Sequence, residues 1–505
     1  MTHRTASTCC LCRCVPIPQP ATRILCLAVL LVGWMVGRPC TAQTAGAEPT
    51  AFLSASPSVS ASASPAFVGR ASSSALRRGD GRRDGPGRAV AVDRADDEPS
   101  RARQWRDRRQ SKRQTMHPPR PGWLDRTGRF IRRTRGAVLG DQVLLDLPDI
   151  DLYGIRPVFG GLPAGAGLSA GLNYQPRFLD GANRHAYAQA LYSLNGYYGG
   201  DAIYGVEGDD YVHYAYARYH HKPQEDFYGT GPDSREDAEA IYGVDEVLVG
   251  GLFGRSLGDN LTLGTHASVR ADRFVQGTAE GGMPHVSDRF PEAAGVGRDV
   301  TYVMIGSFVE YDSRDVPGDR AYGQRFAPTE DRLRRLSLDA TSGLYLSSQI
   351  THHLDAGYDR FSFTRFSIDL QEYFSIDEGT HHGLALRQFA SFTHTSGDQK
   401  VPFYRLQSVG GSESLRGYPT GRFRDYNVLL TNAEVRCQVW HWLDMAVFGD
   451  AGHVFRRFDD LGADTIRGNV GVGFRLRTDE GTAARLEFAR GTEGTRMTLE
   501  LGSLL

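Results

Sequence analysis

The chain has 505 residues and a formal net charge of −1, and 23% of its residues are charged. The neutral total hides an asymmetry: residues 1–136 carry 24 Lys and Arg against 9 Asp and Glu, and the remainder carries 34 against 50. This division excludes a chain of uniform character and indicates that two different segments are joined.

Residues 1–42 have the features of a secretory signal peptide. An apolar run, 24–37, follows Arg4, Arg13 and Arg23 and precedes small residues, with cleavage expected after Ala42. The run is too short to cross a bilayer as a helix, which needs about 20 residues. We therefore expect the chain to be exported.

Cysteine usage agrees with export. Only Cys437 follows the predicted cleavage point, so the mature chain has no internal disulfide to form in an oxidising compartment. The other six cysteines lie in or just before the predicted signal peptide: Cys9, Cys10, Cys12, Cys14, Cys26 and Cys40.

Residues 43–148 read as a disordered extension. Its first part, 43–100, is rich in Ala, Ser and Pro and lacks the apolar residues that offset the loss of chain entropy. Its second part, 101–135, is dense in arginine, which is typical of a nucleic-acid arm or of a solvated tail that contacts anionic lipid. Export removes nucleic acid as a partner, so we expect a solvated tail that can touch anionic lipid headgroups.

From about residue 149 onward, apolar and polar residues alternate. In the segment 365–376, Phe366 and Ile368 fall on one face, and Ser367 and Asp369 fall on the other. Such alternation over many segments is typical of β-strands with one apolar and one polar face.

Two architectures have this pattern, a soluble sandwich and a membrane barrel. Charged residues at mid-strand, strands of about 10 residues, and aromatic residues at strand ends, as in 439–442, favour the barrel. We predict an all-β fold over residues 149–505, a transmembrane antiparallel β-barrel of about 16 strands, counted from about Gly167 to the C-terminus.

The last five strands are predicted at 425–440, 443–455, 466–477, 482–490 and 495–503. The strand count places the long segment 274–299 at the periplasmic end of the barrel, where turns are usually short.

Three motifs follow one another between residues 402 and 454. They are the Gly-rich loop sequence Leu415-Arg416-Gly417-Tyr418, the strand sequence Glu434-Val435-Arg436, and the F-x-D-x-G residues Phe448, Asp450 and Gly452. In order and spacing they resemble the bacterial surface antigen superfamily, which includes the BamA- and TamA-type outer-membrane barrels. The sequences DFYGTGP at 226–232 and EYDSRD at 310–315 add to a resemblance that covers about residues 150–505.

The resemblance implies an integral outer-membrane barrel that inserts or translocates other proteins, with its lumen gated by the inward-folded loop 415–418. It implies outer-membrane lipid and unfolded outer-membrane or secreted proteins as partners. Relatives carry periplasmic POTRA modules of βααββ pattern, and no such pattern is found between Ala42 and Gly154. If the chain inserts or translocates proteins, a separate periplasmic partner acting in trans is therefore expected.

Two other functions remain open at this point. One is a structural or passive pore that keeps the fold without assembly activity, which the lack of recognisable POTRA modules favours. The other is an outer-membrane hydrolase, for which the sequence offers no credible catalytic constellation.

Alternation also predicts partners for Arg416, independently of the family. On strand 443–455, Met445 and Val447 are apolar and belong on the lipid face, which turns Asp450 toward the lumen. The same argument turns Glu434 inward on the preceding strand. We expect Arg416 to pair with Asp450, with Glu434 close by, because a planar guanidinium suits bidentate carboxylate pairing.

Other chemistry is weakly supported. The G-x-S-x-G matches at 167–171 and 254–258 lie in a strand and in a predicted hairpin turn, not in the strand-to-helix turn that a nucleophile requires. Cys437 falls on the lipid face, where a buried thiol is inert. Neighbouring histidines on a strand point in opposite directions and cannot chelate one ion; the three pairs are His220–His221, His352–His353 and His381–His382. We expect no catalytic residue, metal or cofactor.

Overall fold

The structure is a computed structural model, and the part described is mainly the region predicted to form the barrel. The described residues are 108, 111–112, 154–159, 162, 166–167, 169–176, 184–208, 210–278, 282–316, 336–377, 380–440, 442–478 and 481–501. They belong to one compact unit. The predicted signal peptide and most of the predicted extension 43–148 lie outside them.

Sixteen antiparallel strands form one sheet, in which each strand pairs with its neighbours in sequence order, except that β11 pairs with β14. The fold class predicted from the sequence is confirmed. The strands of this sheet are β1 (Ile155–Phe159), β2 (Ser169–Tyr174), β3 (Arg184–Ser193), β4 (Tyr198–Glu207), β5 (Tyr211–Phe227), β6 (Ala240–Leu257), β7 (Leu261–Val275), β8 (Val300–Asp312), β9 (Gly343–Asp355), β10 (Phe363–Ser375), β11 (Gly383–His394), β14 (Asn427–Trp440), β15 (Leu443–Phe455), β16 (Arg467–Thr478), β17 (Gly481–Gly491) and β18 (Gly494–Leu501).

The two faces of the sheet have the polarity of a membrane barrel. On β6, Val249 and Phe253 are 53% and 47% exposed, whereas Glu246 is buried. On β7, Arg270 and Asp272 are buried in the same way. An outward apolar face and an inward charged face suit a barrel in lipid with a polar lumen, and they are the reverse of a soluble core.

Helices are short in the described part of the chain. They are α4 (Val286–Arg289) and the 3-10 turns η3 (Glu236–Ala238), η4 (Phe403–Arg405), η5 (Phe458–Asp460) and η6 (Ala463–Thr465). Within these described residues, no helix has the length and apolar character needed to cross a membrane.

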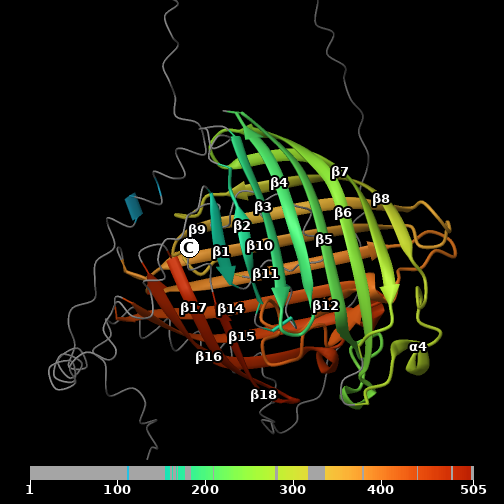
Figure 1. Ribbon diagram of the computed structural model, residues 1–505. Helices are drawn as coiled ribbons and strands as arrows, with labels where there is room; N and C mark the ends of the chain where they lie inside the picture. The colour runs from blue at the N-terminus through green and yellow to red at the C-terminus, as the bar shows by residue number, and fades with distance from the viewer. Residues whose placement is uncertain are drawn as a thin grey trace, which may run out of the picture. The chain divides into compact units, whose positions relative to one another are not determined.

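The loop between β11 and β14 occupies the interior of the barrel. Arg424 donates to the Tyr242 hydroxyl on β6 at 2.6 Å, and Tyr418 donates to the Gly468 carbonyl on β16 at 3.1 Å. One loop thus contacts both an early and a late strand. Figure 1 shows the sheet curling so that its green and its orange-to-red strands form separate walls.

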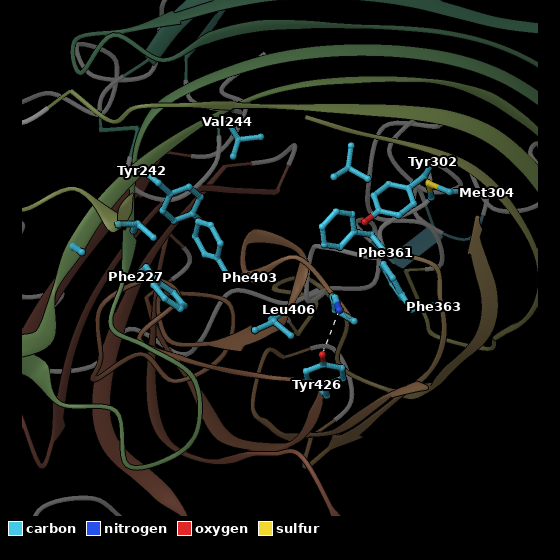
Figure 2. Packing of buried hydrophobic residues seen from close by; sticks show 14 residues of the cluster. Phe227, Tyr242, Val244, Tyr302, Met304, Phe361, Phe363, Phe403, Leu406 and Tyr426 are labelled. Atoms are coloured by element: carbon cyan, nitrogen blue, oxygen red, sulfur yellow. Dashed lines mark hydrogen bonds between the residues drawn. The ribbon is translucent and has the colours of Figure 1, made fainter. Parts of the chain in front are cut away.

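The base of this loop is held by an aromatic cluster. Phe403 lies 4.8 Å, between ring centroids, from both Phe227 at the end of β5 and Tyr242 on β6. Tyr426 belongs to the same buried cluster, and its hydroxyl accepts a hydrogen bond from the Val401 N–H at 3.3 Å. Figure 2 shows these side chains converging from the strand wall and from the loop.

The predicted position of segment 274–299 at the periplasmic end is wrong. The Phe403 N–H, at the base of the Arg416 loop, donates to the Ala294 carbonyl at 2.7 Å, so both loops lie at one end of the barrel. The long connection at the opposite end is 313–342, between β8 and β9. The error arises because one miscounted strand reverses the side assigned to every earlier turn.

The predicted and observed strand boundaries agree best near the C-terminus. The predicted segments 443–455 and 482–490 correspond to β15 and β17 within one residue at each end. Near the start, β1 precedes Gly167, where the sequence-based count began. Alternation is weak there, so the strand was missed.

We predict that Trp440 and Trp442 lie at the membrane interface on the side opposite the Arg416 loop. Their rings are stacked, with centroids 5.5 Å apart, at the turn between β14 and β15. Indole rings favour the headgroup region. Depth-dependent fluorescence quenching in vesicles should therefore place both rings at headgroup depth. The Trp440→Phe/Trp442→Phe variant isolates their signal from the other three tryptophans. Quenching at the bilayer centre would contradict this topology.

Candidate functional site

The loop between β11 and β14 carries a hairpin with an inward-pointing tip. The hairpin strands are β12 (Gln407–Val409) and β13 (Phe423–Asp425), which pair antiparallel. Gly410 and Gly411 begin the tip with φ values of 124° and 89°. Glycine adopts such values without the steric cost that other residues meet, so the chain turns sharply where it leaves β12.

Arg416 lies at the centre of the site. Its Nε and Nη2 donate to the two carboxylate oxygens of Asp450 at 2.9 and 2.7 Å. Its Nη1 donates to Glu434 at 3.0 Å and to Glu487 at 3.1 Å. The guanidinium carbon lies 3.4 Å from the centroid of the Phe448 ring. One cation therefore meets three carboxylates and an aromatic face while its residue is only 6% exposed.

The Arg416 guanidinium remains charged in this setting. Burial alone lowers its pKa, but Asp450, then Glu487 and Glu434, raise the pKa above its ordinary value. Removing one partner of a buried ion pair costs about 3–5 kcal/mol, because the other charge is left without compensation. The same penalty would fall on the three carboxylates if the tip left the lumen without water replacing it.

Asp450 lies on β15 and is oriented by donors from the two neighbouring strands and from the loop tip. From β14 the Asn432 amide donates to one of its oxygens at 2.8 Å, and from β16 the Asn469 amide donates to the other at 2.8 Å. The backbone N–H of Arg416 adds a bond at 3.3 Å. The two asparagine amides hold the carboxylate in position even without the guanidinium, which reduces the entropy lost on pairing.

Glu434 joins the loop tip to the wall. It accepts hydrogen bonds from Arg475 on β16 at 2.5 Å and from its strand neighbour Arg436 at 2.6 Å, besides the bond from Arg416. Glu434 is 2% exposed. Three guanidinium groups around one carboxylate make this residue a junction in the buried charge network.

The three other tip residues pack tightly. Leu415 is fully buried and lies against Gly452, where an added Cβ would meet its side chain at 3.3 Å. Gly417 approaches β16 so closely that a Cβ there would lie 2.7 Å from Asn469 Cβ. The Tyr418 hydroxyl bonds to the Gly468 carbonyl at 3.1 Å.

The structure therefore brings together all eight residues that the sequence singled out. They are Leu415, Arg416, Gly417, Tyr418, Glu434, Phe448, Asp450 and Gly452. Sequence reasoning did not assign Glu487, Asn469 or Arg475 to the site. Each lies on the polar face of its strand, so the same alternation could have found them.

The two other family motifs lie at opposite ends of the barrel. In the first, 226–232, the Gly231 N–H donates to the Arg424 carbonyl at 2.8 Å, which ties the β5–β6 connection to the loop hairpin. In the second, 310–315, Arg314 pairs with Asp312 at 2.8 Å, near the start of the 313–342 connection.

The weaker candidates occupy ordinary positions. Ser169 and Ser256 of the two G-x-S-x-G matches are buried in strands β2 and β6, and Gly254 to Leu257 lie within β6 instead of the predicted hairpin turn. Cys437 is a free, partly exposed thiol on β14. In the residues that the structure describes, no group of three or more His, Cys, Asp or Glu side chains could hold a metal ion.

We predict that Gly417→Ala displaces the loop tip. The added methyl group would lie 2.7 Å from Asn469 Cβ and 2.8 Å from the Gly491 nitrogen, so the tip must move away from β16. Tryptic cleavage within 410–422 should become several times faster in the folded barrel. Gly468→Ala is the matched control, since its Cβ meets only the Asp450 carbonyl, at 3.4 Å. Equal cleavage rates in both variants would show that close approach does not hold the tip.

The sequence and the structure were compared with curated proteins, with solved structures and with protein-family models. None of the curated proteins matches the sequence. A solved structure of BamA from Haemophilus ducreyi lacking POTRA domains 1–3 aligns at 14% identity and a TM-score of 0.47, covering 78% of this chain and 80% of that one. CdiB from Acinetobacter baumannii and CdiB from Escherichia coli align at 11% and 10% identity and TM-scores of 0.41 and 0.40, covering 69% of this chain and 59% and 60% of theirs.

Residues 325–496 match the Omp85 superfamily domain. This match confirms the family resemblance inferred from the motifs, and it includes the loop tip and its ligands Glu434, Asp450 and Glu487. The part of the chain that holds the Arg416 loop and the strands that bind it is therefore the part that matches the Omp85 superfamily domain.

Proposed function

We propose that this chain is an integral outer-membrane barrel that inserts or translocates other proteins, and that the tip 415–418 gates its lumen. The observation that carries the proposal is the buried contact of Arg416 with carboxylates on three strands, β14, β15 and β17. The match of residues 325–496 to the Omp85 superfamily domain supports it.

The contacts of the tip suit a gate with two states. A buried ion network is bistable, because a partly broken network leaves uncompensated charges in a medium of low dielectric. Water or a polar chain entering the lumen would solvate Asp450 and Arg416 together and so stabilise the released state. Binding that favours one state shifts the population toward it.

The two faces of the barrel suit the proposed partners. The outward apolar residues fit outer-membrane lipid, and the inward charged residues fit an unfolded polypeptide in transit. Because no POTRA pattern occurs between Ala42 and Gly154, a periplasmic partner supplied in trans would capture such a client. Nucleic acid has no role in this proposal.

A passive pore is the second candidate, and one feature favours it. A cavity of about 230 Å³ lies between the loop and the wall formed by β5–β7. Charged side chains line it, among them Arg218, Glu246, Arg270 and Asp272. If this charged cavity opens to both ends of the barrel, it would admit small solutes even while the tip stays docked.

We predict that Arg416→Ala and Asp450→Ala each release the tip while the barrel still folds. Each leaves a buried opposite charge, at a cost of about 3–5 kcal/mol, which water entry reduces. Channel conductance in planar bilayers should rise and fluctuate more. The exchange Arg416→Asp/Asp450→Arg restores the Arg–Asp pair and should bring back part of the original behaviour. The rescue should be incomplete, because Glu434 and Glu487 still face position 416 and repel a carboxylate there.

The control for this experiment is Arg457→Ala, which removes an exposed arginine from the connection between β15 and β16. It should leave conductance unchanged. Heat-modifiable migration on gels reports whether each barrel is folded. Unchanged conductance in folded Arg416→Ala protein would refute the gate.

We predict that depletion of this chain lowers the outer-membrane levels of other β-barrel or secreted proteins several-fold. Quantitative mass spectrometry of the outer-membrane fraction measures this effect. Unmodified protein and Arg457→Ala should restore the levels, whereas Arg416→Ala should not. Unchanged levels, together with swelling of liposomes that contain the purified barrel, would establish the passive pore instead.

A further inference from the structure

A short buried segment crosses the end of the barrel opposite the Arg416 loop. We call residues 336–341, which precede β9, the strap. The Ser337 N–H donates to the Tyr373 hydroxyl on β10 at 2.7 Å, and the Ala340 carbonyl accepts from Arg436 on β14 at 3.0 Å. Asp339 accepts from Arg477 on β16 at 3.0 Å and from Thr482 on β17 at 3.2 Å. The strap therefore spans the inner wall from β10 to β17.

The strap is packed, unlike a solvent-exposed turn. Leu336 and Ala340 are 7% and 1% exposed and pack with Tyr373 and Ala385 of β10 and β11. The Ala340 N–H donates to the Ser337 hydroxyl oxygen at 3.1 Å, which closes the segment on itself. Apolar anchors at 336 and 340 thus fix its position along the wall.

Charges hold the strap across the lumen. Arg477, which binds Asp339, also donates to Asp444 on β15 at 3.1 Å. Lys112, from the region predicted to be a disordered extension, donates to the Asp339 carbonyl at 2.9 Å and to the Thr341 hydroxyl at 3.1 Å. The strap is therefore bound from several directions at the same end of the barrel as the Trp440–Trp442 turn, where the Arg477 N–H bonds to the Trp442 carbonyl at 2.9 Å.

A continuous chain of buried hydrogen bonds and ion pairs joins the strap to the loop tip. Arg436 donates from Nη1 to the Ala340 carbonyl and from Nε to Glu434 at 2.6 Å. Glu434 in turn accepts from Arg416 at 3.0 Å. Arg436 is 4% exposed and Glu434 is 2% exposed. Two arginines and one carboxylate thus connect elements that enter the barrel from opposite ends.

We propose that the strap is a second closure of the lumen, and that Glu434 and Arg436 couple its docking to that of the Arg416 tip. When Arg416 leaves, Glu434 retains only Arg436 and Arg475 and draws Arg436 toward itself and away from the Ala340 carbonyl. When the strap leaves, Arg436 loses a buried acceptor and competes more strongly for Glu434. Each element therefore stabilises the docked state of the other, and such coupling is reciprocal.

This inference rests on the proposed lumen gate but not on any client protein. Its test is cysteine accessibility in the purified full chain in liposomes, with the reporter Ala340→Cys in a Cys437→Ser background. An impermeant maleimide should label this reporter at least tenfold more slowly than an Ala463→Cys reporter, which lies in an exposed turn. Asp339→Asn and Thr482→Val, which remove strap contacts without touching the ligands of Arg416, should accelerate labelling at position 340.

Coupling is tested with distant variants. Arg416→Ala should accelerate labelling at position 340 at least threefold, whereas Arg457→Ala should not. In the reverse direction, Asp339→Asn should accelerate labelling of a Ser414→Cys reporter. Ser414 immediately precedes the tip and is 1% exposed. Heat-modifiable migration confirms folding of each variant.

Two results would overturn the proposal. Labelling at position 340 as fast as at 463 in otherwise unmodified protein would show that the strap is not docked. Acceleration by Asp339→Asn without any response to Arg416→Ala would show that the two closures are independent. Because labelling needs no substrate, failure here is distinct from failure of the insertion experiment.

Discussion

The rest of the interior depends on one constraint: the guanidinium of Arg416 is buried and must be compensated. Three carboxylates from three strands surround it, and Asn432 and Asn469 position the most important of these, Asp450. Removing charges from water costs several kcal/mol per ion, so the network is favourable only when its geometry is complete. This requirement fixes where the loop tip lies in the interior and how closely Gly417 approaches β16.

Much of this arrangement could be predicted from the sequence because strand periodicity is local. Met445 and Val447 are apolar, and a period of two then turns Asp450 inward without knowledge of any distant residue. The same argument placed Glu434 correctly, and the family motif supplied Arg416 as their counterpart. The boundaries of β14 to β17 followed from clear alternation bounded by Gly- and Asp-rich turns.

The rest could not be predicted because it depends on contacts between distant segments. Consecutive strands run in opposite directions, so the end of the barrel at which a turn lies depends on whether the number of strands counted is odd or even. One miscounted strand therefore placed the connection 274–299 at the wrong end. Alternation places Glu487 on the polar face of its strand, but nothing local shows that a loop residue 71 positions away reaches it. Backbone groups and the Asp339 side chain make most of the polar contacts of the strap, and such contacts leave no pattern in a sequence.

The two anchors of the Arg416 loop respond differently to temperature. Its base is held by the aromatic cluster around Phe403, and hydrophobic contacts of this kind weaken on cooling. Its tip is held by buried ion pairs, whose desolvation penalty falls as temperature rises. Warming therefore strengthens the ionic contacts of the tip, and it does not weaken the hydrophobic contacts of the base. Cooling weakens the hydrophobic contacts, so the base loosens first. A chain adapted to a colder habitat would need to reinforce the aromatic end of this loop, and its charged end could stay as it is.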